Sequence, residues 1–339
     1  MTIKFQKKAE WFRFNDSQGN LIERKTEVRF DPLTGESSRL IFDPGLVLTP
    51  PDYTEVAEQN GGAKCPFCSE NLLKMTPVFQ KEITEQGRIF QGEAVVFPNL
   101  FPYSKHNGVV IFSGQHYIRL KEFTPTIMKD TFIAAQNYIQ KVIVSDNEVR
   151  YASINWNHLP YSGGSVLHPH LHVIVSESPT NYQALINEKA NAYESENEYF
   201  TSLYETEKSL GERWIGEQGN VAWMHAYAPK GHNDFIAVFP GKNTIHDIEE
   251  QDWEDFAAGL QAIFSTLTEQ GFASFNMALH VSIDAASKQS IHARLIPRFT
   301  VGMLDTSDMN FSQALHQEPL TYKVPEEVAA KARVHFQKI

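Results

Sequence analysis

Three histidines alternate with other residues along one short segment of the chain, His168, His170 and His172. Because side chains of an extended strand alternate between its two faces, the three imidazoles would lie on one face. Leu171 and Val173 would then face a core. A neutral imidazole is a nucleophile near pH 7, and the phosphorus–nitrogen bond that it forms is labile enough for a second acceptor to break. The segment therefore predicts nucleophilic attack on phosphorus, against the alternative of three histidines on a solvated strand.

The turn before this segment, Gly163, Gly164 and Ser165, suits the same chemistry. Glycines make such a turn flexible, and the backbone N–H groups of a turn can bind an anion. We therefore expect a phosphate to lie against this turn, within reach of the histidines.

The two cysteines of the chain, Cys65 and Cys68, form a Cys-Pro-Phe-Cys turn. Two cysteines exclude a disulfide framework, so the pair indicates either a redox site or half of a metal site. A redox pair usually follows a strand and opens a helix in a βαβ unit. Here a Gly-Gly loop precedes the turn and Pro77 soon ends the segment after it, which favours zinc.

A structural zinc site needs four nitrogen or sulfur ligands, so two ligands must come from elsewhere in the chain. His116 and His168 are the best candidates, and His106 and His158 are the weaker alternatives. If His168 binds zinc, the metal would fix the strand that presents His170 without touching the phosphate. Four protein ligands leave no open position, so the zinc would be structural rather than a Lewis acid.

The composition predicts a soluble, cytoplasmic protein of two domains. The chain has 339 residues, which is long for one core, and 42% of them are hydrophobic. A net charge of −11 argues against a nucleic-acid partner, which would need a basic surface. No long uncharged apolar run is present and the first residues lack the apolar core of a signal peptide, so no membrane partner is expected.

A strand–strand–helix–strand–strand order occurs twice, which indicates an internal duplication. The first copy has strands near 93–99, 108–113, 150–156 and 168–175, with a helix that opens at Thr124-Pro125; the second has strands near 221–227, 234–240, 274–280 and 291–297, with a helix over 248–270. Aligning the last strands puts Ser290, His292 and Arg294 in place of the three histidines. We therefore expect the second copy to supply structure and part of the substrate pocket.

Together these residues resemble the galactose-1-phosphate uridylyltransferase branch of the histidine-triad (HIT) superfamily. The motifs that carry the resemblance follow one another in the family's order: Asp-Pro-Leu-Thr-Gly-Glu at 31–36, Cys-Pro-Phe-Cys at 65–68, Val-Phe-Pro-Asn-Leu-Phe-Pro at 96–102, His116, Gly164-Ser165 and His168-Pro169-His170. The resemblance implies an α+β fold of two HIT-like lobes, each an antiparallel half-barrel sheet with a packed helix. It also implies a homodimer with its active site near the subunit interface.

On this basis residues 1–177 form the N-terminal lobe with the zinc site and the catalytic His-Pro-His. Residues 178–215 form an acidic linker, expected as a solvated helix over the first lobe, and 216–339 form the C-terminal lobe and tail. The resemblance also implies roles for single residues: Cys65, Cys68, His116 and His168 as zinc ligands, His170 as the nucleophile, Ser165 with Gly163 and Gly164 at the phosphate, Asn99 and Asn157 at the nucleotide, and Gln317 at the sugar.

The chain departs from the family pattern at three places. His172 replaces a glutamine, and histidine there is typical of the superfamily's nucleotide hydrolases and of some phosphorylases. An imidazolium can protonate a leaving oxygen, which would favour different acceptors. The arginines expected shortly after the Leu-Thr-Gly turn are absent. The family's second metal would use His280 and His292, with Glu188, but Arg294 replaces an expected histidine, so we do not expect a second metal.

The resulting prediction is a zinc-containing nucleotidyltransferase of galactose metabolism. It would move a nucleoside monophosphate between a nucleotide sugar and a sugar 1-phosphate through a nucleotidyl-histidine, with His170, His172 and Ser165 in catalysis. The first alternative keeps the intermediate but uses water or phosphate as acceptor, as in a nucleotide hydrolase or a dinucleoside polyphosphate or nucleotide-sugar phosphorylase. The second is a zinc-stabilised binding protein without catalysis. The sequence leaves uridine against adenine, and the sugar, open.

Overall fold

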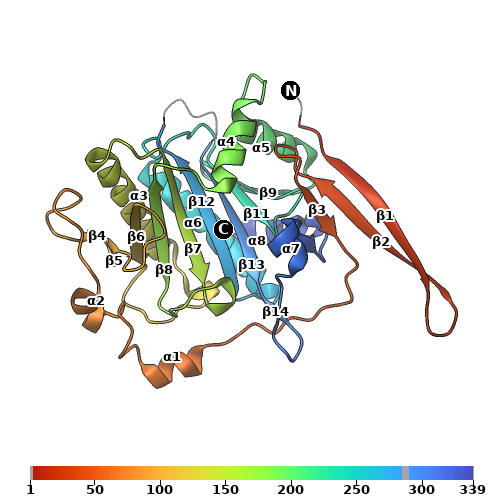
Figure 1. Cartoon of the computed structure of the whole chain (residues 1–339), viewed down its shortest axis with the longest axis horizontal. Coiled ribbons are helices and arrows are strands. Elements are labelled where there is room, and N and C mark those ends of the chain that lie inside the picture. Colours follow the sequence, from red (N-terminus) through yellow and green to blue (C-terminus); the bar gives the residue numbers. More distant parts are fainter. Residues whose placement is uncertain (1–2, 285–289, 339) are drawn as a thin grey trace.

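The computed structural model describes residues 3–284 and 290–338 and centres on one large antiparallel sheet (Figure 1). Its strands are β4 (Ile89–Gln91), β5 (Ala94–Pro98), β6 (His106–Ile111), β7 (Tyr151–His158), β8 (His170–Ser176), β9 (Trp214–Gln218), β10 (Val221–His225), β11 (Phe235–Val238), β12 (Ser274–Ser282) and β13 (His292–Arg298). They lie in the order β4-β5-β6-β8-β7-β12-β13-β11-β10-β9.

This order confirms the predicted duplication. Taken inward from its own edge, each half repeats one arrangement: β4-β5-β6-β8-β7 in the first and β9-β10-β11-β13-β12 in the second. The halves meet where β7 pairs with β12, so the two lobes share one continuous sheet. The result is the expected α+β fold of two related antiparallel lobes.

The helices of the described chain are α1 (Thr54–Asn60), α2 (Ser69–Met75), α3 (Pro125–Ser145), α4 (Asn181–Asn191), α5 (Tyr199–Leu210), α6 (Glu250–Glu269), α7 (Phe311–His316) and α8 (Pro325–Phe336), with 3-10 turns at Leu120–Glu122 and Pro160–Ser162. The two long helices follow their sequence signals. Thr124 accepts a hydrogen bond from the Ile127 amide at the start of α3, and Gly271, with φ of 81°, follows the end of α6. Within the described ranges, no helix is long and apolar enough to cross a bilayer.

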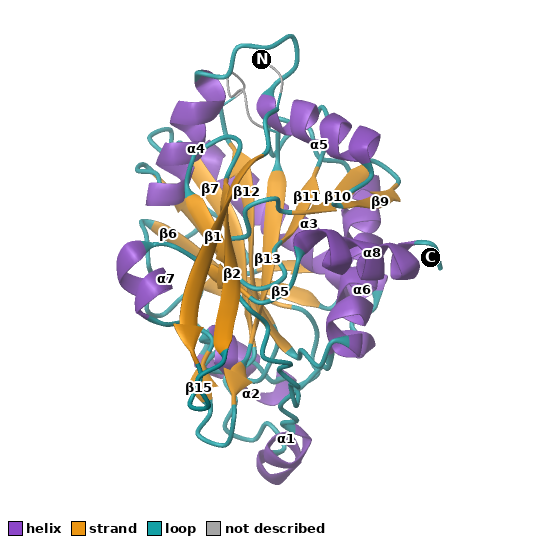
Figure 2. Cartoon of the chain, turned by 90° about the vertical axis from the view of Figure 1, so that its right-hand side faces the viewer, coloured by secondary structure: helices purple, strands orange, loops and turns teal. Residues whose placement is uncertain are grey.

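Helices cover one face of the sheet completely and the other face only in part. α3, α6 and α8 lie on one side (Figure 2), where alternate strand residues such as Trp156, Leu171 and Val173 form the main core. The opposite face carries His170 and His172 in the first half. Because the two residues follow the period of two along β8, burying Leu171 and Val173 turns the histidines to this open side.

The segment 178–215 differs from its prediction. It forms two helices rather than one, and α5 packs against strands of the second half rather than over the first lobe. Phe200 and Leu203 are buried in a cluster with Ile236 and Val238. The acidic residues of the segment mask this apolar face, which is why its composition suggested a solvated helix.

Three N-terminal strands and one strand near the C-terminus form a smaller sheet, in the order β1-β2-β3-β16, that was not predicted from the sequence. It consists of β1 (Gln6–Asn15), β2 (Leu21–Phe30), β3 (Ser37–Leu40) and β16 (Leu320–Thr321); β14 (Thr300–Val301) and β15 (Thr306–Ser307) form a separate short hairpin. The β1–β2 hairpin projects from the body of the molecule as an arm (Figure 1). Trp11, Phe12 and Leu21 on this arm are more than half exposed, at 59%, 67% and 64%.

A buried ion network ties the base of this arm to α5 and α8. Glu326 of α8 accepts hydrogen bonds from Arg29 at 2.8 and 3.0 Å and from Arg213 at 2.8 Å. Arg213 also donates to the buried Glu207 at 2.8 Å. Burial opposes the charge on Glu326, but the hydrogen bonds from Arg29 and Arg213 outweigh it and hold its pKa at about 2.

We expect the Glu326→Gln variant to lose about 3 kcal/mol of unfolding free energy at pH 7, because two buried arginines then lose their shared carboxylate. The folded pKa lies near 2 and the ordinary value is 4.5, so the loss is full above pH 4.5 and vanishes as the pH falls toward 2. Urea unfolding of both proteins from pH 7 to pH 3 measures this. Glu250→Gln, which breaks an exposed pair with Lys129, should change little. A difference for Glu326→Gln that does not depend on pH would contradict the account.

Candidate active site

A pocket of about 290 Å³ opens on the uncovered face of the first half. It brings together most of the predicted site residues, with apolar walls from several loops. The lining residues are Pro66, Phe67, Met75, Thr76, Pro77, Phe97, Pro98, Asn99, Leu100, Phe101, Tyr103, Val109, Asn157, Gly163, Gly164, Ser165, Val166, His170 and His172. None of these carries a full charge, so the pocket presents neutral donors and acceptors to a ligand.

His170 is held in one tautomer at the start of β8. Its Nδ1 lies 2.8 Å from the backbone oxygen of His168, and only an N–H can make that contact. Nδ1 therefore carries the proton, and Nε2 keeps its lone pair. The side chain is 7% exposed and Phe67 packs edge-on at 5.2 Å. Burial lowers the pKa of His170, so the ring is neutral and nucleophilic at pH 7.

His172 lies one strand repeat further along the same face. Its ring is 5.2 Å from that of His170 and 5.5 Å from that of Tyr103. Burial, with a smaller effect of His170, lowers its pKa to about 4. Asn155 on β7 donates to the backbone oxygen of His172 at 3.2 Å and fixes this part of β8. In the free protein His172 is therefore neutral at pH 7, and its buried Nδ1 has no hydrogen-bond partner among the described residues.

The glycine turn has a tight geometry that corrects one expectation. The amides of Gly163 and Gly164 do not face an anion, because they donate to the backbone oxygens of Pro160 at 2.9 Å and Leu159 at 3.2 Å. A Cβ on Gly164 would lie 2.9 Å from the backbone oxygen of Asn157, so only glycine fits there. Ser165, which follows the turn, is exposed and lines the pocket.

The cysteines meet two histidines in one cluster. The ligand atoms of Cys65, Cys68, His116 and His168 all lie within 4.8 Å of one another. The Nδ1 atoms of His116 and His168 are 3.3 and 3.6 Å from the Cys68 sulfur. A Cβ on Gly62 would lie 2.4 Å from that sulfur, so the glycine loop closes directly over the cluster. This Cys₂His₂ set can hold a metal ion, as predicted.

The outer contacts of the cluster also suit a metal. Nε2 of His168 lies 2.8 Å from the backbone oxygen of Ser113, so it carries the proton and leaves Nδ1 as the ligand atom. Convergence of two histidines on the cysteines favours a metal over a dithiol redox pair, which needs no imidazole ligands. The weaker alternatives lie elsewhere: His158 is buried beside Phe123, and His106 pairs with Asp146 at 2.8 Å.

A second metal does not fit the other half. Nδ1 of His292 contacts the Ser290 oxygen at 3.2 Å, as His170 contacts the His168 oxygen, which places the two residues in equivalent positions. However, Arg294 stands beside His292 and forms a buried ion pair with Asp234. A guanidinium binds no metal and repels a cation. Glu188 is exposed and pairs with Lys189, and the cysteine–histidine cluster is the one metal-type group among the described residues.

The remaining predicted residues have different surroundings. Asn99 is engaged at both ends of its amide, since its Nδ2 donates to Asn107 at 2.9 Å and its Oδ1 accepts from the Phe101 amide at 3.1 Å. It therefore shapes the loop over the pocket, with one N–H left for a ligand. Asn157 lines the pocket directly. Gln317 does not line it: Gln317 is the exposed left-handed C-cap of α7, with φ of 54°.

Three residues of the site were not predicted from the sequence: Phe67, Tyr103 and Asn276. Phe67 lies inside the recognised Cys-Pro-Phe-Cys motif and could have been found there. Tyr103 directly follows the recognised Val-Phe-Pro-Asn-Leu-Phe-Pro motif at 96–102 and could have been found from it. Asn276, whose amide contacts Asn157 at 2.7 Å, comes from the second half and has no local signal.

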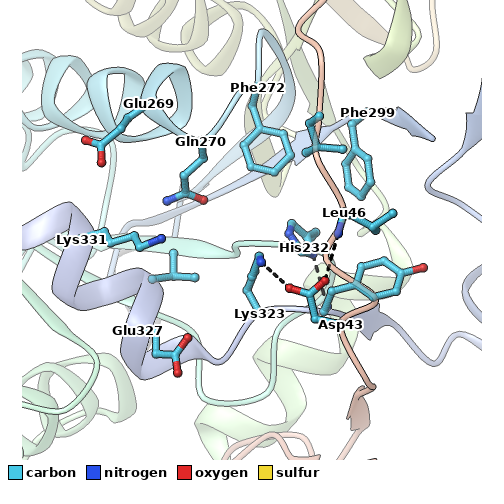
Figure 3. Close-up of a pocket in the computed structure, with 13 residues that line it drawn as sticks. Asp43, Leu46, His232, Glu269, Gln270, Phe272, Phe299, Lys323, Glu327 and Lys331 are labelled. Atoms are coloured by element: carbon cyan, nitrogen blue, oxygen red, sulfur yellow. Dashed lines mark hydrogen bonds and ion pairs between the residues drawn. The ribbon is translucent and has the colours of Figure 1, made fainter. Parts of the chain in front are cut away.

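Another cavity, of about 210 Å³, lies among the second half and the C-terminal tail (Figure 3). Lys323 pairs with Asp43 at its side, and the buried His232 packs among Phe272, Phe299 and Tyr322. Its lining shares no residue with the histidine pocket. Its lysine Lys323 is paired with Asp43, and Nδ1 of its histidine His232 accepts from the Tyr322 amide at 3.5 Å. The histidine pocket, which holds His170 and His172 together, is therefore the candidate active site.

Solved structures with the same overall fold match nearly the whole chain. An ADP-glucose phosphorylase from Arabidopsis thaliana, solved with bound ADP-glucose, shares this fold with a TM-score of 0.70 and 17% identity over 91% of this chain and 98% of that one. A galT-like protein from the same plant gives 0.67 and 16%, over 90% and 98%. A uridylyltransferase gives 0.65 and 17%, over 92% and 98%.

At the level of sequence, no model of a known protein family matches the chain. An uncharacterized protein of Archaeoglobus fulgidus is 30% identical over 317 residues, which cover 93% of this chain and 94% of that protein. The chain therefore belongs to one family with this archaeal protein.

Proposed function

We propose that this protein is a nucleotidyltransferase that works through a nucleotidyl-His170 intermediate. The observation that carries the proposal is the tautomer of His170. The His168 oxygen holds the proton on Nδ1, which leaves a neutral Nε2 in a pocket large enough for part of a nucleotide. Nucleotide sugars are the donors that the ADP-glucose-bound neighbour suggests.

The reaction proceeds in two displacements. In the first, Nε2 of His170 attacks the α-phosphorus of the nucleotide sugar; a P–N bond forms, the bond to the bridging oxygen breaks, and sugar 1-phosphate leaves. In the second, a phosphate oxygen of the acceptor attacks the same phosphorus. A new P–O bond forms, the P–N bond breaks, and neutral His170 is restored.

The surrounding groups stabilise charge and orientation. Ser165 and the free N–H groups of Asn157 and Asn99 would donate to the phosphate oxygens, where charge develops. His172 would hydrogen-bond the transferred group in place of the family's glutamine. Zinc on the Cys₂His₂ cluster would supply structural rigidity only, since four protein ligands leave no open position. It would fix His168, whose backbone oxygen orients His170.

The acceptor in the favoured proposal is a sugar 1-phosphate, as in the uridylyltransferases. Inorganic phosphate is the second candidate, which would make the protein a nucleotide-sugar phosphorylase. Two observations favour it: His172 stands where those transferases have glutamine, and one structural neighbour is an ADP-glucose phosphorylase. Both candidates share the first displacement and differ only in what removes the nucleotide.

An acceptor chase tests the proposal. The protein is incubated with ADP-glucose or UDP-glucose labelled in the α-phosphate, freed of substrate, and then given buffer, inorganic phosphate or a hexose 1-phosphate. We expect retention of label in buffer and its release within seconds by a phosphate acceptor. Release as nucleoside diphosphate identifies a phosphorylase, and release as nucleotide sugar identifies a transferase. Equally fast release in buffer would show a hydrolase, and failure to take up label from either substrate would contradict the proposal.

We further propose a homodimer in which the β1–β2 arm contacts the second copy. An isolated hairpin is marginal in water, and this arm exposes Trp11, Phe12 and Leu21. Light scattering should therefore give twice the chain mass of 38.5 kDa. Substitution of Trp11 and Phe12 by serine should shift the mass toward that of one chain. A monomeric wild type at micromolar concentration would contradict this arrangement.

A further inference from the structure

A hydrogen-bonded series of side chains runs from the second half of the sheet to the candidate active site. Asn276 of β12 lies directly opposite Asn157 of β7. Its Nδ2 donates to Asn157 Oδ1 at 2.7 Å and to the backbone oxygen of Ser162 at 2.8 Å. Its Oδ1 accepts from Nη1 of Arg298 at 2.9 Å. Arg298 also donates to both carboxylate oxygens of Asp308, at 2.8 Å each.

The direction of this series is set at its far end. A guanidinium has donors only, so Arg298 requires Asn276 to present its carbonyl oxygen. The NH₂ group of Asn276 must then face Asn157, and Asn157 must accept this hydrogen bond with its Oδ1. The free end is the NH₂ group of Asn157, at the pocket that Asn157 helps to line. Within the described chain, no protein atom accepts from this nitrogen.

The same amide of Asn276 also holds the turn that carries Ser165. Leu159 has a φ of 68°, a strained value for a residue with a side chain, and it begins this turn. The amides of Gly163 and Gly164 are bonded inside the turn. The bond from Asn276 to Ser162 links the turn to the second half of the sheet, and thereby fixes the position of Ser165 relative to Asn157.

We propose that Asn276 and Arg298 are positioning residues for nucleotidyl transfer. They hold Asn157 as a hydrogen-bond donor toward the anionic nucleotide and hold the Ser165 turn in register. This inference rests on the proposed function. A donor that is oriented in advance stabilises developing charge without reorganisation, and it matters more in a pocket whose lining carries no lysine or arginine. The second half of the sheet, which lacks the nucleophile, thus orients groups of the active site through the pairing of β12 with β7.

Two nearly isosteric variants separate positioning from folding. In Asn276→Asp, the carboxylate still accepts from Arg298 but requires Asn157 to rotate and donate to it, which turns the Asn157 oxygen toward the nucleotide. Both variants lose the bond to the Ser162 oxygen, so this loss does not distinguish them. In Asn276→Leu, Asn157 is merely left without a partner. We expect the rate at which His170 takes up labelled nucleotide to fall about 100-fold in Asn276→Asp and about 10-fold in Asn276→Leu. The melting temperature should follow the opposite order, because Asn276→Asp strengthens the contact with Arg298.

A double-mutant cycle removes the objection that the new carboxylate only repels the phosphates. In an Asn157→Leu background, Asn276→Asp should cause a much smaller further loss than it causes alone, because only its effect through Ser162 remains. Asn147→Asp, which adds the same charge on an exposed turn after α3, serves as the matched control and should label at the wild-type rate.

Equal labelling rates in wild type and Asn276→Asp, or additive losses in the cycle, would overturn the inference. So would a labelling rate that follows the melting temperature, with Asn276→Leu the slower variant. Failure of the wild type itself to take up label would overturn the proposed function and this inference together, so the two failures are distinguishable.

Discussion

Replacement of His170 by alanine is expected to abolish nucleotidyl transfer, lowering the rate by at least about 10⁴-fold, because the pocket loses the imidazole whose Nε2 lone pair is fixed by the contact of Nδ1 with the His168 oxygen. The fold and the metal content should not change. Among the described residues, the His170 imidazole makes one hydrogen bond, to the His168 oxygen, and His170 is not one of the four cluster residues. Turnover with ADP-glucose or UDP-glucose, circular dichroism and metal analysis of one preparation measure all three.

His172→Gln is the matched control for this experiment. It replaces a neighbouring imidazole on the same face of β8 by the residue that the uridylyltransferases have there. We expect this variant to take up labelled nucleotide within about 10-fold of the wild-type rate, since His172 does not form the bond to phosphorus. Its preference among acceptors should change. Turnover by His170→Ala above about one-hundredth of the wild-type rate would remove His170 from the role.

Loss of the Cys₂His₂ cluster is expected to cost both stability and activity. When the free zinc concentration is about a thousand times the dissociation constant, zinc binding stabilises the folded chain by about 4 kcal/mol. Cys68→Ser or extraction of the metal should therefore lower the unfolding free energy by roughly that amount. The cluster includes His168, whose backbone oxygen orients His170. We therefore expect turnover to fall with the metal content and to return when zinc is restored.

A matched pair of histidine variants distinguishes the cluster from other sites. His116→Asn removes a cluster residue, whereas His106→Asn removes a histidine that pairs with Asp146 outside the cluster. Zinc measured by mass spectrometry should be one per chain in wild type and His106→Asn, and far below one in His116→Asn. Full zinc content in both variants would contradict the assignment. Activity that depended on oxidation of Cys65 and Cys68 instead of on metal would support the redox alternative.

The repeated strand–strand–helix–strand–strand order could be predicted because its signals are local. Thr124-Pro125 and Gly271 mark helix ends by their own conformational preferences, and each strand coincides with an apolar run in the sequence. The histidine strand was also predictable, since a period of two with Leu171 and Val173 buried turns the imidazoles to one face. These features need no knowledge of distant parts of the chain.

The N-terminal arm and the helices at 178–215 could not be predicted in the same way. β1 is exposed along nearly its whole length, so no buried face produces a pattern. Its pairing with β2 depends on register across a turn rather than on burial. In α5 the acidic residues dominate the composition, and the apolar contacts of Phe200 with the second half become visible only once the chain is folded.

Within the site, it was easier to predict which residues are present than to predict where their hydrogen-bonding groups point. Gly163 and Gly164 indicated a tight turn correctly, but their amides bond inside it, and sequence alone does not show where an N–H points. The contact between Asn157 and Asn276 joins residues 119 positions apart. Such a contact follows from the pairing of β7 with β12, which no local pattern encodes.

The most direct test of the central claim is to locate the covalent nucleotide on the protein. The wild type is incubated with ADP-glucose or UDP-glucose, digested under alkaline conditions that preserve phosphorus–nitrogen bonds, and analysed by mass spectrometry. We expect one nucleoside monophosphate per chain, on the peptide that contains residues 168–176, with fragments that place it on His170. A nucleotide on another residue, or an unmodified protein that nevertheless turns over substrate, would contradict it.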